Sequence, residues 1–470
     1  MSEPVTISKP AQKRRVGKRA TQVRRGFTDR MIFWCLVLAV VIAPLLIGSS
    51  GITSLMVMKY FAVAILCLWA IKILLVQELN LSLSVPALAL IGYCLLVAIQ
   101  LLPLPGVVPI VTPSAEVLRI IPSLKVTQSI SLDPVATEQA LAKLVTLVFL
   151  FIVAHNFITR RNHVLFGQII LWLGFAIAIF GLVQHFTWTG KIYWFYTATD
   201  VAFGPFTNRD RFAGYTEMTM ALALAAAFSP ENVGGKRALY SFVAIVMGVA
   251  IVVCGSRGGI VAMVCEFTLI TILALWYRSS ETMGEKFGLP NWVLPVAGVA
   301  LLVCAIGIGA SYLGMDRTLA GFETLFKNDL DVATGDRIKV WKGSWQLFWT
   351  RPLLGSGLGA FGVAYTHFAQ ENGSYWFREV HNDYLQVLTD TGLVGALLGV
   401  IFLLGLVQAA RRKLANLEQE SYMLVLGAIV GIVAILIHSL VDFNLQIAAH
   451  SLLFLMLANF LVIESSNAKQ

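Results

Sequence analysis

Charged side chains are scarce in this chain, since only 13% of its 470 residues are Asp, Glu, Lys or Arg whereas 57% are hydrophobic. Soluble globular domains carry about twice that charged fraction, so the composition excludes an ordinary soluble enzyme. The net charge of +9 comes largely from basic residues within positions 1–30, directly before the first apolar run. That placement is typical of a cytoplasmic flank on anionic lipid, so we predict membrane lipids as partners and no nucleic acid.

Cysteine is also sparse, and its spacing carries no signature. The six cysteines lie within apolar segments and form neither a Cys-x-x-Cys pair nor a Cys/His group. The sequence therefore predicts no disulfide framework and no structural zinc site. No small-residue cleavage site follows the first apolar run, so we expect the first helix to be retained rather than cleaved as a signal peptide.

Long apolar segments are abundant. A membrane-spanning helix needs about 20 mostly apolar residues. We predict an all-α polytopic membrane protein of about twelve transmembrane helices, with both ends cytoplasmic because the count is even and the N-terminal tail is basic. The predicted spans are 31–49, 55–76, 86–103, 138–158, 164–185, 213–229, 237–254, 259–277, 292–312, 390–410, 421–440 and 447–464.

This topology divides the chain into five parts. They are a basic cytoplasmic tail (1–30), spans 1–9 (31–312) with external loops near 104–137 and 186–212, a large external loop (313–389), spans 10–12 (390–464) and a cytoplasmic tail (465–470). The large loop is dense in Arg, Asp, His, Trp and Gly, and long external loops are exempt from the charge rule for short ones. We therefore expect the chemistry of the protein to lie in this loop.

Two helices are predicted within the large loop. The first runs from Arg337, capped by Asp336, to about Trp349, and one of its faces is apolar. Arg351-Pro352 ends it, and three glycines within 355–359 predict a flexible turn. The second helix starts at His381 and leads into span 10. The predicted apolar face of the first helix comprises Ile338, Trp341, Trp345 and Phe348.

Arginines recur where spans meet the external loops. Arg209 and Arg211 occur in NRDR, Arg257 in GSRGG and Arg337 in GDR. A guanidinium at the membrane boundary is costly unless it is paired or faces water, and its planar fork suits diphosphate oxygens. The alternative for Arg257 is a hairpin arginine that reaches headgroup phosphates, and the sequence alone favours neither.

His381 is the best candidate for a general base. It opens a helix in HNDYLQ, with Asn382, Asp383 and Tyr384 available as partners. A neutral imidazole accepts a proton from a hydroxyl while a neighbouring group fixes its tautomer. The alternative is a helix-start histidine that only bonds locally.

Three other groups of acidic or histidine residues can be explained by structural roles rather than by chemistry. Asp329 and Asp331 form a DxD pattern, but a solvated acidic turn explains it better, so we assign no metal. His438 and Asp442 either pair to brace a site or satisfy each other. Glu266 is predicted to be a packed, partnered carboxylate rather than a proton relay.

Taken in order, the motifs GPFTNRDRFAGY, GSRGG, GDRIKVW, PLLGSGLGAF and HNDYLQVLTDTG resemble the O-antigen ligase and polymerase superfamily of bacterial cell envelopes, over about residues 130–446. The family often has NRNHFAGY where this chain has Asp210 and Arg211, which leaves open whether Arg209 or Arg211 faces the donor. The resemblance implies a multi-pass protein of the bacterial inner membrane whose active site faces the periplasm.

The resemblance also implies a reaction. A glycan passes from undecaprenyl diphosphate to a sugar hydroxyl on lipid A core or a growing polysaccharide, or to a protein. His381 would be the base, and Arg209 and Arg257 would bind the donor diphosphate, with Arg337 and Arg211 assisting. Asn208, Asp383 and Tyr384 would complete the substrate-binding set. We expect inversion in a single displacement, with no cofactor and no metal.

Two other classes compete with this interpretation. A multispan transporter or flippase shares the twelve-span layout, and Glu266 would then be its coupling site. Its polar residues, however, would gather at mid-bilayer rather than in one external loop. An assembly scaffold would have no need of His and Arg residues on one face.

Overall fold

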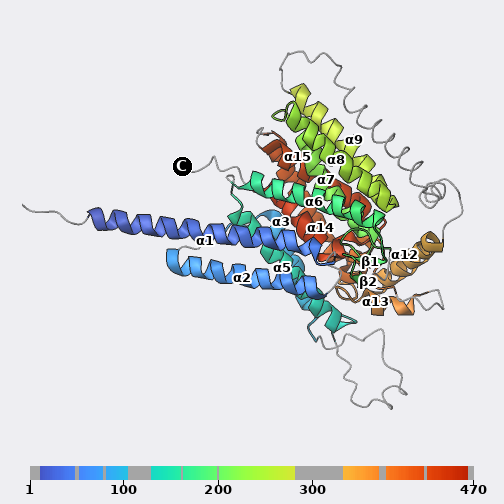
Figure 1. Ribbon diagram of the computed structural model, residues 1–470. Coiled ribbons are helices and arrows are strands. Elements are labelled where there is room, and N and C mark those ends of the chain that lie inside the picture. The colour runs from blue at the N-terminus through green and yellow to red at the C-terminus, as the bar shows by residue number, and fades with distance from the viewer. Residues whose placement is uncertain are drawn as a thin grey trace, which may run out of the picture.

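The computed structural model describes residues 11–47, 52–77, 81–103, 129–159, 162–197, 201–280, 332–369, 377–415, 417 and 421–463. Within these residues the chain is helical apart from loops and one short hairpin (Figure 1). The long helices are α1 (Ala11–Leu45), α2 (Ile52–Val76), α3 (Val85–Gln100), α5 (Pro134–Phe157), α6 (His163–Phe186), α7 (Arg209–Phe228), α8 (Gly235–Cys254), α9 (Arg257–Ser280), α12 (Val332–Thr350), α14 (Asp383–Ala415), α15 (Tyr422–His438) and α16 (Ala448–Val462).

Short elements complete the described part of the fold. The strands β1 (Lys191–Ile192) and β2 (Tyr196–Thr197) pair antiparallel, with Lys191 opposite Thr197. In Figure 1 this hairpin lies with α12 and α13 at one end of the long helices. The remaining elements are α13 (Phe361–Ala364) and the 3-10 turns η2 (Tyr365–His367) and η4 (Asn444–Gln446).

The predicted all-α polytopic membrane fold is confirmed. Eleven of the twelve predicted spans coincide with a helix, and the ninth, 292–312, lies outside the described residues. In the part of the chain that the structure describes, seven helical stretches are long and apolar enough to cross a membrane, and α3, α15 and α16 are apolar but shorter. Also outside the described residues are 1–10, 104–128, the DxD pattern at 329–331, and 465–470.

Helix α7 is the centre of the bundle. Every residue from Phe212 to Ala227 is buried, and α7 packs against α6, α8, α9, α15 and α16. A helix that is apolar on all sides is stable only when neighbours cover all of it. On α15, a Cβ at Gly427 would lie 2.9 Å from the Leu222 Cα, and one at Gly431 would lie 3.0 Å from the Met218 carbonyl oxygen. Glycines four residues apart thus let the α15 and α7 backbones approach closely.

Helix α14 breaks near its start, and a loop docks into the break. Gly392 has φ 64° and ψ −163°, a conformation available to glycine, and interrupts the helix. The amides that the break frees find new acceptors, since the Leu393 N–H donates to the Pro352 carbonyl at 2.7 Å and the Val394 N–H to the Leu353 carbonyl at 3.1 Å. Backbone groups buried at this junction are therefore paired, as their desolvation requires.

The glycine turn after α12 is a fixed part of that junction, which corrects the predicted flexible turn. Gly355, Gly357 and Gly359 all have positive φ. The Gly357 N–H donates to the Asp390 carbonyl at 3.0 Å, and the Gly359 N–H to Asp390 Oδ2 at 2.9 Å. A Cβ at Gly355 would lie 2.4 Å from the Asp390 carbonyl, so only glycine allows this approach.

Helix α12 differs from its prediction at its start and in its packed face. It begins at Val332, so Asp336 lies within the helix rather than capping it, and it ends at Thr350 as predicted. Of the predicted face, Phe348 is buried and Trp341 packs on the local core, whereas Trp345 is 49% exposed. Val340, Ser344 and Leu347 are also buried, so the packed face is shifted from the predicted one, because α12 packs on α13, η2 and α14.

Candidate functional site

The site is organised by the loop 439–446, which joins α15 to α16. The Asp383 carboxylate at the start of α14 accepts hydrogen bonds from Ser439 Oγ at 2.8 Å and from the Leu445 N–H at 3.0 Å. Gln446 Nε2 donates to its other oxygen at 3.3 Å. Asp383 is buried, so these bonds offset the loss of its hydration and hold the loop against α14.

The neighbours of Asp383 attach the same two elements. The Asn382 side chain caps α14 by accepting from the Leu385 N–H at 3.0 Å, and its Nδ2 donates to the Leu440 carbonyl at 2.9 Å. Tyr384 Oη donates to the Leu436 carbonyl on α15 at 2.8 Å. The HNDY motif therefore uses its Asn, Asp and Tyr to fix the place of the histidine that precedes them.

His381 itself is held by its backbone. Its φ of 56° is in the left-handed region, which is uncommon for a residue with a side chain. The preceding residue, Val380, is fixed at both polar groups, since its carbonyl accepts from Trp341 Nε1 at 3.1 Å and its N–H donates to Gln386 Oε1 at 2.7 Å. A strained backbone held by surrounding contacts is typical of functional positions.

The His381 ring lies beside two consecutive loop residues. Its Nδ1 is 3.6 Å from Asp442 Oδ1, and its ring meets Phe443 edge-on with centroids 4.8 Å apart. Burial raises the pKa of the Asp442 carboxyl, but His381, His438 and the Phe443 N–H outweigh it, so the pKa lies below the usual range. The His381 side chain stays 29% exposed, so the charged carboxylate orients an imidazole that substrate can still reach.

Arg211 reaches the same phenylalanine from α7. Its guanidinium carbon is 5.4 Å from the Phe443 ring centroid, and its Nη1 donates to Thr207 Oγ1 at 3.1 Å. The backbone of Arg211 is also fixed, because its carbonyl accepts a hydrogen bond from His450 Nε2 at 2.7 Å. Arg211 and His381 thus share one aromatic ring as a support.

Arg209 lies against the turn that leads to Arg257. Asn208 caps α7 by accepting from the Asp210 N–H at 2.7 Å, which places Arg209 at the helix start. A Cβ at Gly255 would lie 3.4 Å from Arg209 Nη1. Because Gly255 ends α8 and Arg257 begins α9, the two arginines lie on adjoining helix starts at one end of the bundle.

Arg337 and the first turn of α9 both contact Val441. Arg337 Nη1 donates to the Val441 carbonyl at 3.1 Å. A Cβ at Gly258 would lie 3.2 Å from Val441 Cγ2, so the residue after Arg257 packs on the same side chain. The segment 441–443 is therefore in contact with α9, α12, α7 and His381, and of the predicted residues it contacts Arg211, Arg337 and His381.

A second histidine lies sealed beneath this segment. His438 Nδ1 is 3.0 Å from Glu217 Oε2, and the two side chains are 1% and 0% exposed. The first turn of α9 covers the ring, since a Cβ at Gly258 would lie 2.6 Å from its Nε2 and Cδ2. A pairing of His438 with Asp442 was possible from the sequence, but His438 pairs with Glu217, and Asp442 lies beside His381.

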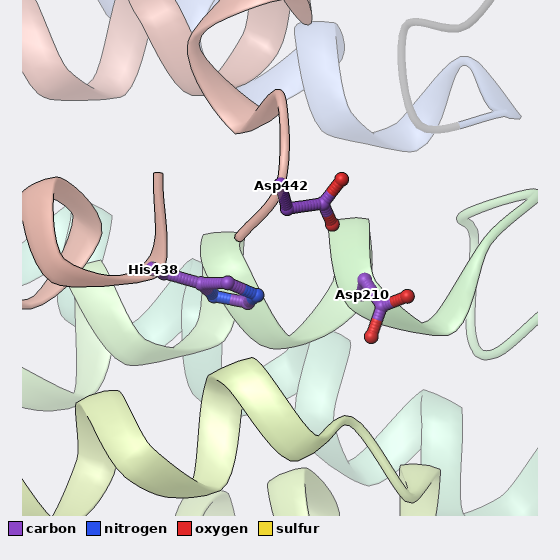
Figure 2. Close-up of side chains that lie close together, drawn as sticks. All are labelled: Asp210, His438 and Asp442. Atoms are coloured by element: carbon purple, nitrogen blue, oxygen red, sulfur yellow. The ribbon is translucent and has the colours of Figure 1, made fainter. Parts of the chain in front are cut away.

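Three of these side chains could hold a cation. Asp210, His438 and Asp442 each offer one ligand atom, and the three atoms lie within 4.8 Å of one another (Figure 2). A carboxylate behind the imidazole, here Glu217, is also a common arrangement behind a metal-bound histidine. The same geometry lets the imidazole bridge acidic groups without an ion.

Two acidic residues differ from the sequence-based expectation. Neither oxygen of Glu266 has a hydrogen-bond partner among the described residues although its side chain is 1% exposed, so the expected partner is not found there. Glu379 was not among the predicted site residues, yet it lies near Arg211 and His381, and burial raises its pKa although both of these side chains act to lower it. Its place two residues before His381 was the available signal.

Glu217 was also missed. It is the single acidic residue within the apolar part of α7, and an ionisable residue in such a segment is a functional signal in its own right. Its partner His438 lies 221 positions further along the chain. No sequence spacing connects residues so far apart.

Comparison with known families gives one match. Residues 242–400 match the family model described as O-antigen ligase (Wzy_C). The matched range includes Arg257, Arg337 and His381, whereas α7 and the loop 439–446 lie outside it. A search of curated proteins found no match.

Proposed function

Over residues 242–400 this chain belongs to the O-antigen ligase and polymerase superfamily, and on that premise we propose that it transfers a glycan from undecaprenyl diphosphate to a sugar hydroxyl at the periplasmic face of the bacterial inner membrane. The observation that carries the proposal is the segment 441–443, which joins a partly exposed histidine and a carboxylate to arginines from two helices, Arg211 of α7 and Arg337 of α12. A base and a diphosphate clamp are the two components that this reaction requires.

The donor diphosphate is bound by guanidinium groups. Arg209 and Arg257 lie at adjoining helix starts and form the main clamp, while Arg211 on Phe443 and Arg337 on Val441 extend it toward His381. A guanidinium donates in a planar fork that matches phosphate oxygens, and several of them spread the charge of a diphosphate. Asn208, through its cap of α7, positions the two arginines of that first turn.

The acceptor is activated by His381. Its Nδ1 faces Asp442, which leaves Nε2 for the acceptor hydroxyl. As the hydroxyl oxygen attacks the anomeric carbon, its proton moves to Nε2 and the bond from that carbon to the diphosphate oxygen breaks. The arginines stabilise the negative charge that develops on undecaprenyl diphosphate as it leaves. The carbon is displaced once, so its configuration inverts.

No nucleotide enters this scheme, since the bond to diphosphate already supplies the driving force. We also propose that the guanidinium groups carry out the charge neutralisation that Mg²⁺ performs in other transferases. Asp383 and Tyr384, proposed from the sequence as substrate-binding, act instead by positioning, because both are committed to the loop 439–446 and to α15.

The test is reconstitution of the purified protein in vesicles with an undecaprenyl-diphosphate-linked glycan and a metal chelator. We expect release of undecaprenyl diphosphate together with a lengthened or ligated product. Lipid A core, a second lipid-linked glycan and an acceptor protein are supplied in separate arms, and the arm that yields product identifies ligase, polymerase or protein glycosyltransferase. Movement of intact donor across the bilayer without release would establish a transporter and refute the proposal.

A further inference from the structure

A groove lies at the end of α14 opposite the candidate site. It has a volume of about 530 Å³ and lies between the start of α3 and the last turns of α14 and α16. A second groove of about 720 Å³ adjoins it along α14 and shares Val85, Gly405, Gln408 and Arg412 with it. At about 1.5 Å per residue, Arg412 lies roughly 40 Å along α14 from Asp383, so this region is separate from the site above.

One face of α14 changes from apolar to charged along the grooves. Leu404 is 61% exposed and faces outward from the bundle, Gln408 follows one turn later, and Arg411 and Arg412 follow after another turn. Residues three and four apart lie on the same helix face. From Leu404 to Arg411 the polarity therefore changes over about 10 Å, which is the order of acyl chain, glycerol and phosphate in a phospholipid.

The opposite wall is polar and fixed. Ser84 caps α3 and lines the groove, and Ser82 is tied to α5 because its N–H donates to Asn156 Oδ1 at 2.8 Å and its carbonyl accepts from Asn156 Nδ2 at 3.0 Å. A Cβ at Gly405 would lie 3.0 Å from Pro86, so α14 and α3 meet closely at the floor. The groove is thus formed by packed elements.

The charges around the two grooves have one sign. Among the described residues that line them, the charged side chains are the basic Arg411, Arg412 and Lys413, and none is acidic. Neither Arg411 nor Arg412 has an ion-pair partner within the part of the chain that the structure describes. Basic pockets between transmembrane helices are suited to the phosphates of anionic lipids.

We propose that these two adjoining grooves bind an anionic phospholipid, with its phosphate at Arg411 and Arg412 and its acyl chains along Leu404. A lipid with two phosphates and several acyl chains, such as cardiolipin, fits the pair of grooves best, because Arg411 lines the larger, mainly apolar groove and Arg412 lines both grooves. The inference goes beyond the proposed transfer reaction and does not depend on it.

The test measures cardiolipin binding to the full chain, purified in detergent and stripped of lipid, by native mass spectrometry. In the double variant R411Q/R412Q we expect the affinity for cardiolipin to fall about ten- to thirty-fold, since each basic residue at a lipid surface contributes roughly a factor of five. R411K/R412K should retain most of the binding because it keeps both charges. Phosphatidylcholine, which has no net charge, should bind the wild type and R411Q/R412Q equally.

The matched control is Lys236→Gln, which removes one exposed basic charge at the start of α8, outside both grooves. It should leave cardiolipin binding unchanged. Equal binding of cardiolipin to wild type and R411Q/R412Q would overturn the proposal. Binding of inorganic phosphate alone to the wild type as tightly as cardiolipin would also overturn it. Binding is read without any glycan substrate, so failure of the transfer reaction leaves this result intact.

Discussion

Two His–carboxylate pairs lie within one end of the helical bundle in the described part of the chain, and they differ mainly in exposure. The pair of His438 and Glu217 has a 3.0 Å contact and is sealed between α7, α9 and α15. The pair of His381 and Asp442 is 3.6 Å apart, and its histidine is 29% exposed. The first pair is enclosed and cannot be reached by a hydroxyl, so it serves the fold, whereas the second includes the partly exposed histidine that we propose as the base.

The comparison also shows how stability supports chemistry. His438 immediately precedes the loop 439–446, and Asp442 and Phe443 of that loop hold His381. A buried polar pair with well-matched partners fixes one arrangement of the elements around it. The sealed pair therefore positions the loop on which the exposed pair depends.

The largest expected effect concerns the exposed pair. His381→Ala should lower glycan transfer about 10³- to 10⁴-fold, since it removes the general base. The thermal unfolding midpoint should change little, because the side chain is partly exposed. The control is His367→Ala, an exposed histidine in the same external region, which should transfer normally. Near-normal transfer by His381→Ala would remove this residue from catalysis.

Substitution in the sealed pair of His438 and Glu217 should lower stability, whereas substitution in the exposed pair should lower activity. His438→Gln leaves Glu217 buried without its partner and should lower stability by about 3–5 kcal/mol, measured as a fall in the unfolding midpoint in detergent. The double variant E217Q/H438Q should recover much of that loss, because replacing both charged partners removes the unpaired charge. If the single and double variants unfolded alike, the pair would not be coupled.

The arginine clamp is tested by charge removal. Arg257→Gln should weaken donor binding and lower kcat/KM about 10²- to 10³-fold, as expected for the loss of one charge-stabilising donor. Lys191→Gln removes an exposed charge at the same end of the bundle and should have almost no effect. Donor affinity equal to wild type in Arg257→Gln would contradict the clamp.

A positioning role for Asp442 predicts a smaller loss. Asp442→Asn keeps an oxygen for the Phe443 N–H but removes the charge that faces His381. The rate constant kcat should fall about 10²-fold while KM for the donor stays unchanged, because the donor contacts the arginines. A change in KM with unchanged kcat would instead place Asp442 in donor binding.

The smallest effect is expected at Glu379. Burial raises the pKa of Glu379, because the charged carboxylate is less stable in the folded protein than in the unfolded chain. At a pH above the folded pKa the carboxylate is charged in both states, so it lowers the free energy of unfolding. Glu379→Gln should therefore raise the unfolding midpoint by about 1–3 °C at neutral pH, and the gain should disappear as pH falls below the unfolded pKa near 4.3. A midpoint difference that does not vary with pH would exclude titration of Glu379 as its cause.

Much of the outline could be predicted from the sequence because membrane spans are a local property. A run of about 20 apolar residues specifies a helix whatever surrounds it, and each predicted span in the described residues has its helix. Arg257 and His381 were selected locally too, since charges at span ends carry their own signal. The start and packed face of α12 could not be read in this way, because its partners come from other elements.

The sequence by itself thus determined the class of fold and the residue types available for chemistry. Only the tertiary structure decided which side chains meet: that Asp442 faces His381 rather than His438, that Glu217 seals the other histidine, and that residues 441–443 gather α7, α9 and α12. The reason is physical, since hydropathy acts along the chain whereas pairing of buried polar groups depends on helices that pack hundreds of residues apart.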